Sequence, residues 1–247
     1  MPNPRCQSPQ SEGRLADKPR QLPLRFTHRP ATTRDDLIVS DPVSAAIGIV
    51  DRWPEWPSPI VILVGPTGAG KSHLADVWCD RAGAVAISPA TYDESRAIAA
   101  AEHAPVLVED AERAGFSDNF LFHLINSVRQ NNQTMLMTTR MWPSAWSIEL
   151  PDLKSRLKSA TVVEIGEPDD AMLAQVIVKL FADRQIAVDE RTVAFLVCRM
   201  ERSLDAAQRI VGRMDELALS RGSRISRALA GEALAEFGRD GGFDEVS

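Results

Sequence analysis

The chain has 247 residues, of which 44% are hydrophobic and 25% charged, a composition typical of a globular protein with a full core. Its formal net charge of −6 argues against a broad basic face that would hold nucleic acid. The 3 cysteines form no C-x-x-C pair and the 4 histidines show no ligand spacing, so neither a disulfide framework nor a zinc site is expected. There is no signal-peptide pattern and no apolar run of about 18 residues, so we expect a cytoplasmic protein without a membrane partner.

The N-terminal part of the chain is predicted to be a tail with one interruption. Residues 1–20 are polar and proline-rich, which is typical of disorder. Residues 21–26 carry alternating apolar side chains along a segment that a proline keeps extended, and such anchors suit docking into a partner's groove. A linker that folds back on its own domain explains this pattern equally well. The residues expected to make the contact are Gln21, Leu22, Leu24 and Phe26.

Residues 35–167 are predicted to form an α/β domain. Short apolar strands alternate with helices, which indicates a parallel sheet covered on both faces. We predict five strands, at residues 60–64, 84–88, 105–108, 134–139 and 160–165. The helices are predicted at residues 42–52, 74–81, 91–102, 118–131 and 151–158.

The pattern changes after residue 167. Four amphipathic helical segments follow without a strand between them, and the first two begin with acidic caps. They are predicted at residues 169–184, 189–200, 203–220 and 226–237. Residues 168–238 are therefore expected to form a helical second domain, and residues 239–247 a flexible end.

The segment from Gly65 to Ser72 has the Walker A pattern G-x-x-x-x-G-K-[ST] between a buried strand and a helix. Loops of this kind wrap a phosphate with backbone amides and a helix N-terminus. Lys71 would reach the β- and γ-phosphates, and Ser72 would hold Mg²⁺. The pattern predicts binding of ADP or ATP without distinguishing the two. The residues expected at the nucleotide are Gly65, Thr67, Gly68, Ala69, Gly70, Lys71, Ser72 and His73.

The third predicted strand ends in Glu109 and Asp110, which has the form of a Walker B segment. Glu109 would hold Mg²⁺ through water, and Asp110 would orient or deprotonate an attacking water. The fourth strand ends in polar residues that are candidates for sensing a γ-phosphate, although a solvated loop explains them almost as well. These residues are Thr138, Thr139 and Arg140.

Two arginines are candidates for further roles. Arg156 precedes the last strand, where a side chain is poorly placed for its own nucleotide and well placed for a neighbour's, as an arginine finger supplied in trans would be. A surface salt bridge is the competing interpretation. Arg202 could bring a cation of the helical domain onto the phosphates. Three other arginines lie near it in the sequence: Arg199, Arg209 and Arg213.

Over residues 21–238 this order of motifs resembles the AAA+ class of P-loop NTPases, and within it the DnaA-type replication initiators and the Hda regulators, in their alphaproteobacterial branch. Ile38 and Val39 lie in a segment similar to the adenine contact of this family. Ser155-Arg156 is similar to its box VII arginine finger, and the surroundings of Arg202 are similar to its sensor 2.

The resemblance implies an AAA+ fold with a five-stranded parallel sheet and a C-terminal helical lid domain. It also implies a nucleotide-bound regulator that docks on the DNA polymerase III sliding clamp through residues 21–26. This regulator would stimulate ATP hydrolysis by the DnaA initiator through Arg156, acting near the nucleoid. The chain ends after the lid, without room for the initiator's DNA-binding domain, so DNA would be reached only through the clamp. Self-association is left open.

Two residues depart from the family pattern. Glu109 stands where the family usually has an aspartate, and Arg140 stands where the initiator normally has an acidic residue. Both departures favour weak or no intrinsic hydrolysis. Two other classes stay open: a helicase-loader-like AAA+ ATPase and, with less support, a P-loop small-molecule kinase.

Overall fold

The structure, a computed structural model, describes residues 38, 40–87, 93–112 and 115–240. The predicted tail at residues 1–20, the segment at residues 21–26 and Val39 lie outside these ranges. The sheet and the C-terminal helices belong to one compact unit.

The described residues form one sheet of five parallel strands in the order β2-β3-β4-β1-β5. In the central pair, Ile60 of β1 lies opposite Met135 of β4, and every residue of both strands is buried. Near-continuous apolar strands are what a parallel sheet covered on both faces requires. The strands are β1 (Ile60–Val64), β2 (Val85–Ile87), β3 (Val106–Val108), β4 (Met135–Thr139) and β5 (Thr161–Glu164).

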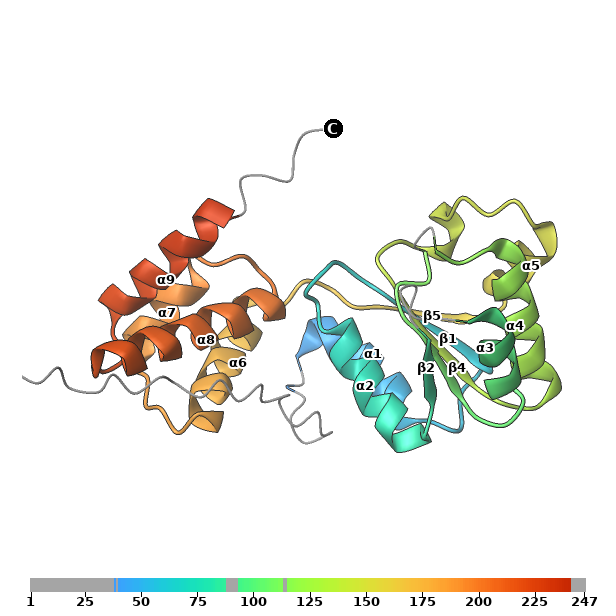
Figure 1. Ribbon diagram of the computed structural model, residues 1–247, viewed down its shortest axis with the longest axis horizontal. Coiled ribbons are helices and arrows are strands. Elements are labelled where there is room, and N and C mark those ends of the chain that lie inside the picture. Colours follow the sequence, from blue (N-terminus) through green and yellow to red (C-terminus); the bar gives the residue numbers. More distant parts are fainter. Residues whose placement is uncertain (1–37, 39, 88–92, 113–114, 241–247) are drawn as a thin grey trace, which may run out of the picture. The chain divides into compact units, whose positions relative to one another are not determined.

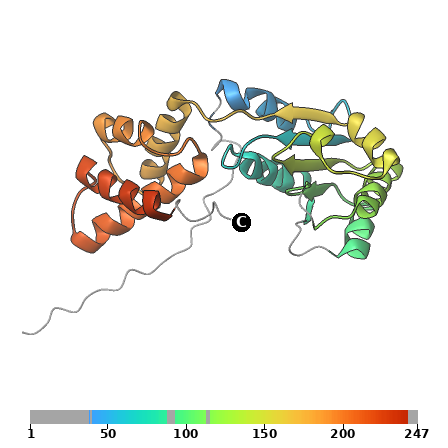
Figure 2. The same cartoon turned by 90° about the horizontal axis from the view of Figure 1, so that it is seen from above.

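Helices cover both faces of the sheet (Figures 1 and 2). One face packs against α1 (Asp41–Asp51) and α2 (Lys71–Ala82). The other packs against α3 (Glu94–Ala100), α4 (Asp118–Gln130) and α5 (Pro151–Lys158). The predicted α/β architecture is confirmed, and most element ends differ by only a few residues. The sequence pattern missed the short 3₁₀ turn η2 (Pro143–Ala145) between β4 and α5.

Three tryptophans fix α2, and with it the loop that precedes this helix. Trp78 is fully buried, stacks on Trp56 with a ring-centroid distance of 5.3 Å, and meets Trp53 edge-on at 6.5 Å. The indole of Trp56 donates a 2.7 Å hydrogen bond to the carbonyl of Ile49, and that of Trp53 donates a 3.0 Å bond to Thr134 Oγ1. The tryptophan- and proline-rich segment after α1 therefore packs against α2 and extends the hydrophobic core on this face of the sheet.

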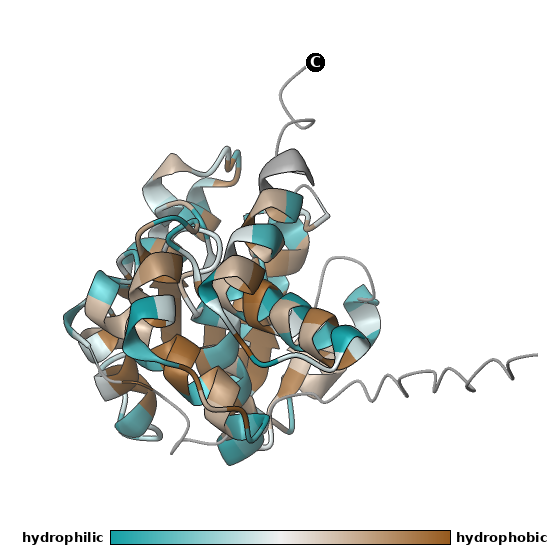
Figure 3. Cartoon of the chain, turned by 90° about the vertical axis from the view of Figure 1, so that its left-hand side faces the viewer, coloured by the Kyte–Doolittle hydropathy of each residue, from teal (hydrophilic) through white to brown (hydrophobic). Residues whose placement is uncertain are grey.

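The lid helices pack on a hydrophobic core of their own, and Figure 3 shows apolar and polar residues alternating around them. In the described chain they are α6 (Asp170–Asp183), α7 (Glu190–Val197), α8 (Leu204–Arg221) and α9 (Arg227–Asp240). The predicted acidic caps are confirmed: Asp169 accepts from the amide of Met172, and Asp189 from that of Thr192. No helix among the described residues is long and apolar enough to cross a membrane.

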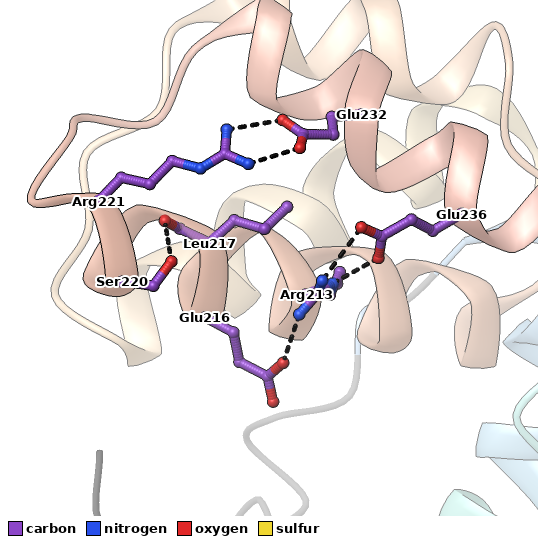
Figure 4. A network of polar contacts seen from close by, with 7 residues as sticks. All are labelled: Arg213, Glu216, Leu217, Ser220, Arg221, Glu232 and Glu236. Carbon is purple, nitrogen blue, oxygen red and sulfur yellow. Dashed lines mark hydrogen bonds and ion pairs between the residues drawn. The ribbon is translucent and has the colours of Figure 1, made fainter. Parts of the chain in front are cut away.

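Charged side chains tie α8 to α9 (Figure 4). Arg213 donates to both carboxylate oxygens of Glu236 and to Glu216, and Arg221 donates to both oxygens of Glu232. These hydrogen bonds lower the pKa of Glu232 and of Glu236 below the ordinary 4.5, because they favour the charged carboxylate.

The lowered pKa values give the sign of a pH effect on lid stability. The contribution of Glu236 is present above pH 4.5 and is lost as the pH falls through its lowered pKa. We expect Glu236→Gln to lower the melting temperature at neutral pH and the difference from the wild type to shrink in acid. Melting followed by far-ultraviolet circular dichroism checks this, with exposed Glu201→Gln as the control. An equal loss at acidic pH would contradict the role of the ion pair.

Candidate functional site

The Walker A segment leaves β1 and enters α2 through a glycine-rich loop. Gly68 and Gly70 have φ angles of +75° and +94°, which glycine adopts without steric cost. A Cβ atom built on Gly65 would lie 2.4 Å from the carbonyl oxygen of Ile165, so this position has no room for a side chain. The loop is therefore a backbone cradle at a helix N-terminus, which fits a phosphate group.

Lys71 begins α2 at the base of this cradle. Its side chain is only 7% exposed, and Nζ donates hydrogen bonds of 2.7 Å and 2.8 Å to the carbonyls of Gly65 and Pro66. Burial lowers the pKa of Lys71, the charge of Arg140 lowers it further, and nearby carboxylates oppose the shift. The ammonium group is thus held by the loop that it would complete around a phosphate.

The two residues predicted to hold Mg²⁺ come together. The hydroxyl of Ser72 on α2 lies close enough to the carboxyl group of Glu109, at the end of β3, to favour the charged form of that carboxyl and so to lower its pKa. Burial raises the pKa of Glu109, and the negative charges of Asp76 and Asp110 raise it further. Hydroxyl and carboxylate oxygens fit Mg²⁺, which is usually held by one or two carboxylates together with substrate phosphates. No cluster of three or more metal-ligating side chains occurs in the described part of the chain.

Asp76 was missed by the sequence analysis, although a signal was present. It follows Ser72 by four positions on α2, and residues at that spacing share one face of a helix. Its negative charge acts on Glu109. The carboxylates at this site therefore come from a helix as well as from the end of a strand.

The second Walker B carboxylate, Asp110, lies at a sharp turn. Its φ of +47° is unusual for a residue other than glycine and costs about 1–2 kcal/mol. The turn is held from β4: the amide of Asp110 donates a 3.1 Å bond to Thr138 Oγ1, and that of Ala111 donates a 2.9 Å bond to the Thr138 carbonyl. The Thr138 hydroxyl, predicted to sense a phosphate, thus has a structural partner.

Arg140 at the end of β4 lies close to these acids. Its Nε is 4.0 Å from Asp110 Oδ1, and its amide donates a 2.9 Å bond to Glu112 Oε1. The other oxygen, Glu112 Oε2, is buried without a hydrogen-bond partner among the described residues. Glu112 also acts on the charge of Lys71, and nothing in the sequence pattern pointed to it. The segments that follow β3 and β4 therefore bring Asp110, Glu112 and Arg140 close enough to act on the charge of Lys71.

The N-terminus of α8 touches the phosphate loop. The amide of Leu204 donates a 2.8 Å hydrogen bond to the carbonyl of Gly68. A Cβ atom on Gly68 would lie 2.4 Å from the Cβ of Ser203, and one on Gly70 would lie 3.1 Å from Leu204 Cδ1. Glycine at positions 68 and 70 therefore allows the close approach of α8 as well as the turn of the loop around a phosphate.

Arg202, the predicted lid cation, lies one residue before the N-cap Ser203 of α8. Its Nη2 is 2.6 Å from Asp170 Oδ1 at the start of α6, and both side chains are more than half exposed. Exposed pairs of this kind contribute about 0–1 kcal/mol, so the guanidinium can exchange partners at little cost. The three alternatives have other neighbours: Arg199 lies over the Phe195 ring, Arg209 pairs with Asp205, and Arg213 with Glu236.

Ile38, the predicted adenine contact, lines a hollow of about 820 Å³. The other walls come from α6 and α7 and are mostly apolar; they include Ala171, Ala174, Val178, Val193 and Val197. None of the lining residues belongs to the phosphate loop. The structure thus places Ile38 against the lid.

Arg156 lies on α5, which is anchored on its neighbours. Leu153 and Leu157 are buried in the core, and Asp118 on α4 accepts bonds of 2.6 Å and 2.9 Å from the amides of Glu149 and Leu150. The side chain of Arg156 is partly buried, and it makes no hydrogen bond or ion pair with any other described residue. A salt bridge within the described chain, the competing interpretation, is not present.

Comparisons with known proteins agree on the fold. No family model matches the sequence. A curated sequence from Haemophilus influenzae, described as an uncharacterized protein, is 24% identical over 173 residues, which are 65% of this chain and 75% of the relative.

Solved structures give closer matches in shape. Domain III of the replication initiation protein DnaA from Thermotoga maritima has a TM-score of 0.71 and 15% identity, covering 87% of this chain and 99% of that chain. A DnaA bound to AMPPCP and single-stranded DNA has a TM-score of 0.66 and 16% identity, covering 87% and 70%. A point mutant of Thermotoga maritima RuvB has a TM-score of 0.65 and 14% identity, covering 83% and 71%. These likenesses confirm the AAA+ P-loop fold predicted for the chain.

The lid contact can be tested with a pair of glycines. Gly68→Ala and Gly83→Ala both place alanine at positive φ, at a shared cost of about 1–2 kcal/mol, but only Gly68 faces another residue within 4 Å. We expect Gly68→Ala to lose more stability and to speed hydrogen exchange at the start of α8. Mass spectrometry of that peptide measures the exchange. Equal exchange in the two variants would contradict a coupling between loop and lid.

Proposed function

We propose that the chain is an AAA+ regulator of replication initiation, which binds ADP or ATP with Mg²⁺ and stimulates ATP hydrolysis by the DnaA initiator in trans. The observation that carries this proposal is the guanidinium of Arg156, which has no partner in the described chain and lies on a helix anchored at its start. An arginine supplied to a neighbouring active site stabilises charge on the transferred phosphoryl group.

The chain's own nucleotide site is better suited to fixing the conformation of the protein than to fast hydrolysis of ATP. Lys71 and Ser72 would hold the phosphates and the metal ion, together with Glu109. However, Asp110 faces Arg140, and the threonine hydroxyls at the end of β4 are engaged by backbone groups. Nucleotide held in the cradle would instead fix the loop that α8 contacts through Gly68. Intrinsic hydrolysis is therefore proposed to be weak or absent.

Docking on the DNA polymerase III sliding clamp is the second part of the proposal. It rests on residues 21–26, which lie outside the described residues, and on their likeness to the clamp-binding peptide of the Hda family. DNA would be met through the clamp, because the net charge of −6 does not favour a broad nucleic-acid surface. The protein would then act in the cytoplasm at the replication machinery.

A helicase-loader-like ATPase acting on DNA is the alternative function. The likeness to RuvB favours it, since one of the matched structures is described as a Holliday junction branch migration motor, with a TM-score of 0.60. In that case DNA would stimulate the chain's own ATPase activity, and the clamp would have no affinity for it. An ATPase assay with and without single-stranded DNA separates the two functions.

Removing the finger gives the sharpest test. We expect Arg156→Ala to lose stimulation of the initiator's ATP hydrolysis by at least tenfold while binding to the clamp stays unchanged, because the guanidinium acts only on the neighbour's phosphates. Single-turnover hydrolysis by ATP-loaded initiator measures the rate. Arg191→Ala, which removes an exposed arginine of the lid helix α7, is the matched control. Undiminished stimulation by Arg156→Ala would show that Arg156 is not an arginine finger.

The clamp contact has its own test. Leu22→Ala combined with Phe26→Ala should abolish co-elution with a bacterial sliding clamp, since the pair removes two of the three alternating apolar anchors. Leu15→Ala changes an apolar residue of the same tail outside the motif and should leave co-elution intact. If the double variant still co-elutes, residues 21–26 are a linker.

A further inference from the structure

The segment between β4 and α5 exposes two adjacent large apolar side chains. Met141 is 47% exposed and Trp142 is 45% exposed, whereas Trp146 and Ile148 of the same segment are 8% and 7% exposed. The segment therefore buries part of its apolar content and leaves one pair outside. Tryptophan buries a large area when it meets a partner, and it is enriched among residues that dominate binding energy.

The backbone that carries this pair is fixed. The carbonyl of Met141 accepts hydrogen bonds from Thr139 Oγ1 at 2.8 Å and from the Trp146 indole at 3.0 Å. The carbonyl of Trp142 accepts a 2.8 Å bond from the amide of Ala145, within η2. The exposure is thus a property of an ordered turn. A surface held in this way loses little freedom when a partner binds, which favours affinity.

The pair lies next to groups already assigned to nucleotide chemistry. It directly follows Arg140, which is half exposed and whose charge acts on Lys71. Further along the segment, η2 packs against α5, the helix of Arg156. The apolar pair therefore belongs to the same part of the α/β domain as the proposed finger.

We propose that Met141 and Trp142, here called the Met-Trp anchor, dock this protein on the nucleotide-carrying α/β domain of the ATPase that receives Arg156. The inference rests on the proposed function and names the surface that would supply its affinity. A single exposed charge contributes about 0–1 kcal/mol, which cannot hold two proteins together. An apolar centre beside that charge can do so, because interfaces combine a buried aromatic core with a charged rim.

Charge supports this choice of partner. The exposed positive side chains of this segment and of α5 are Arg140, Lys154 and Lys158, against the exposed Glu149 and Asp152, and Arg156 on α5 is partly buried. Positive charge therefore slightly exceeds negative charge among these exposed side chains, in a chain whose net charge is −6. It matches a partner surface that presents nucleotide phosphates.

The test separates docking from chemistry. Wild-type protein and Trp142→Ala are titrated into the ATP-bound initiator of the same organism, and the rate of hydrolysis is followed. We expect Trp142→Ala to raise the concentration for half-maximal stimulation at least tenfold while the maximal rate is retained. Arg156→Ala should show the reverse pattern. Leu219→Ala, which removes a 68%-exposed apolar side chain on α8, is the matched control and should change neither value.

Binding is also measured directly, with initiator loaded with a non-hydrolysable ATP analogue. Weaker binding by Trp142→Ala, with partial rescue by Trp142→Phe and unchanged melting temperatures, supports the anchor. An unchanged half-maximal concentration overturns it, and so does a fall in the maximal rate alone. Conversion of a dimer to a monomer by Trp142→Ala, with initiator binding kept, would show that a second copy of this chain covers the anchor. If the wild type binds without stimulating, the proposed function fails, and the binding data still decide on the anchor.

Discussion

The close contact between the phosphate loop and the N-terminus of α8 is the constraint on which both halves of the structure depend. Gly68 offers its carbonyl to the amide of Leu204 and has no side chain to keep Ser203 away. On its other side the loop presses at Gly65 against the backbone that follows β5. A change in the loop conformation therefore cannot stay local, because one boundary belongs to the sheet and the other to the lid.

At the ends of the strands, acidic and basic side chains of the protein lie close to one another. The carboxylates of Asp110 and Glu112 oppose the lowering of the pKa of Lys71, and Arg140 is close to Asp110. These acids thus offset part of the lowering that burial causes. It also means that a bound phosphate would have to compete with the protein's own acids.

Much of the fold could be predicted because it follows from local rules. The buried strands are uninterrupted apolar runs in the sequence. Asp169 and Asp189 are N-cap residues and indicate where two of the lid helices begin. Pairings between distant elements could not be predicted in this way. The ion pair of Arg202 with Asp170, and the place of Asp76 beside Glu109, depend on how helices meet in space. The turn around η2 was also missed, because its hydrogen bonds to Met141 and Trp142 leave no periodic pattern in the sequence.

The two hydrogen bonds that Asp118 accepts also bear on the position of helix α5. Helix α5 begins after Leu150, and the carboxylate of Asp118 in the first turn of α4 accepts from the amides of Glu149 and Leu150, the two residues that precede the helix. The two helices are thus joined at one point and have no independent hinge there. The position of the Arg156 backbone is then set by the packing of α5 on the core of the α/β domain. A neighbouring protein would meet a helix whose place is already set, so recognition here would need little movement of the backbone.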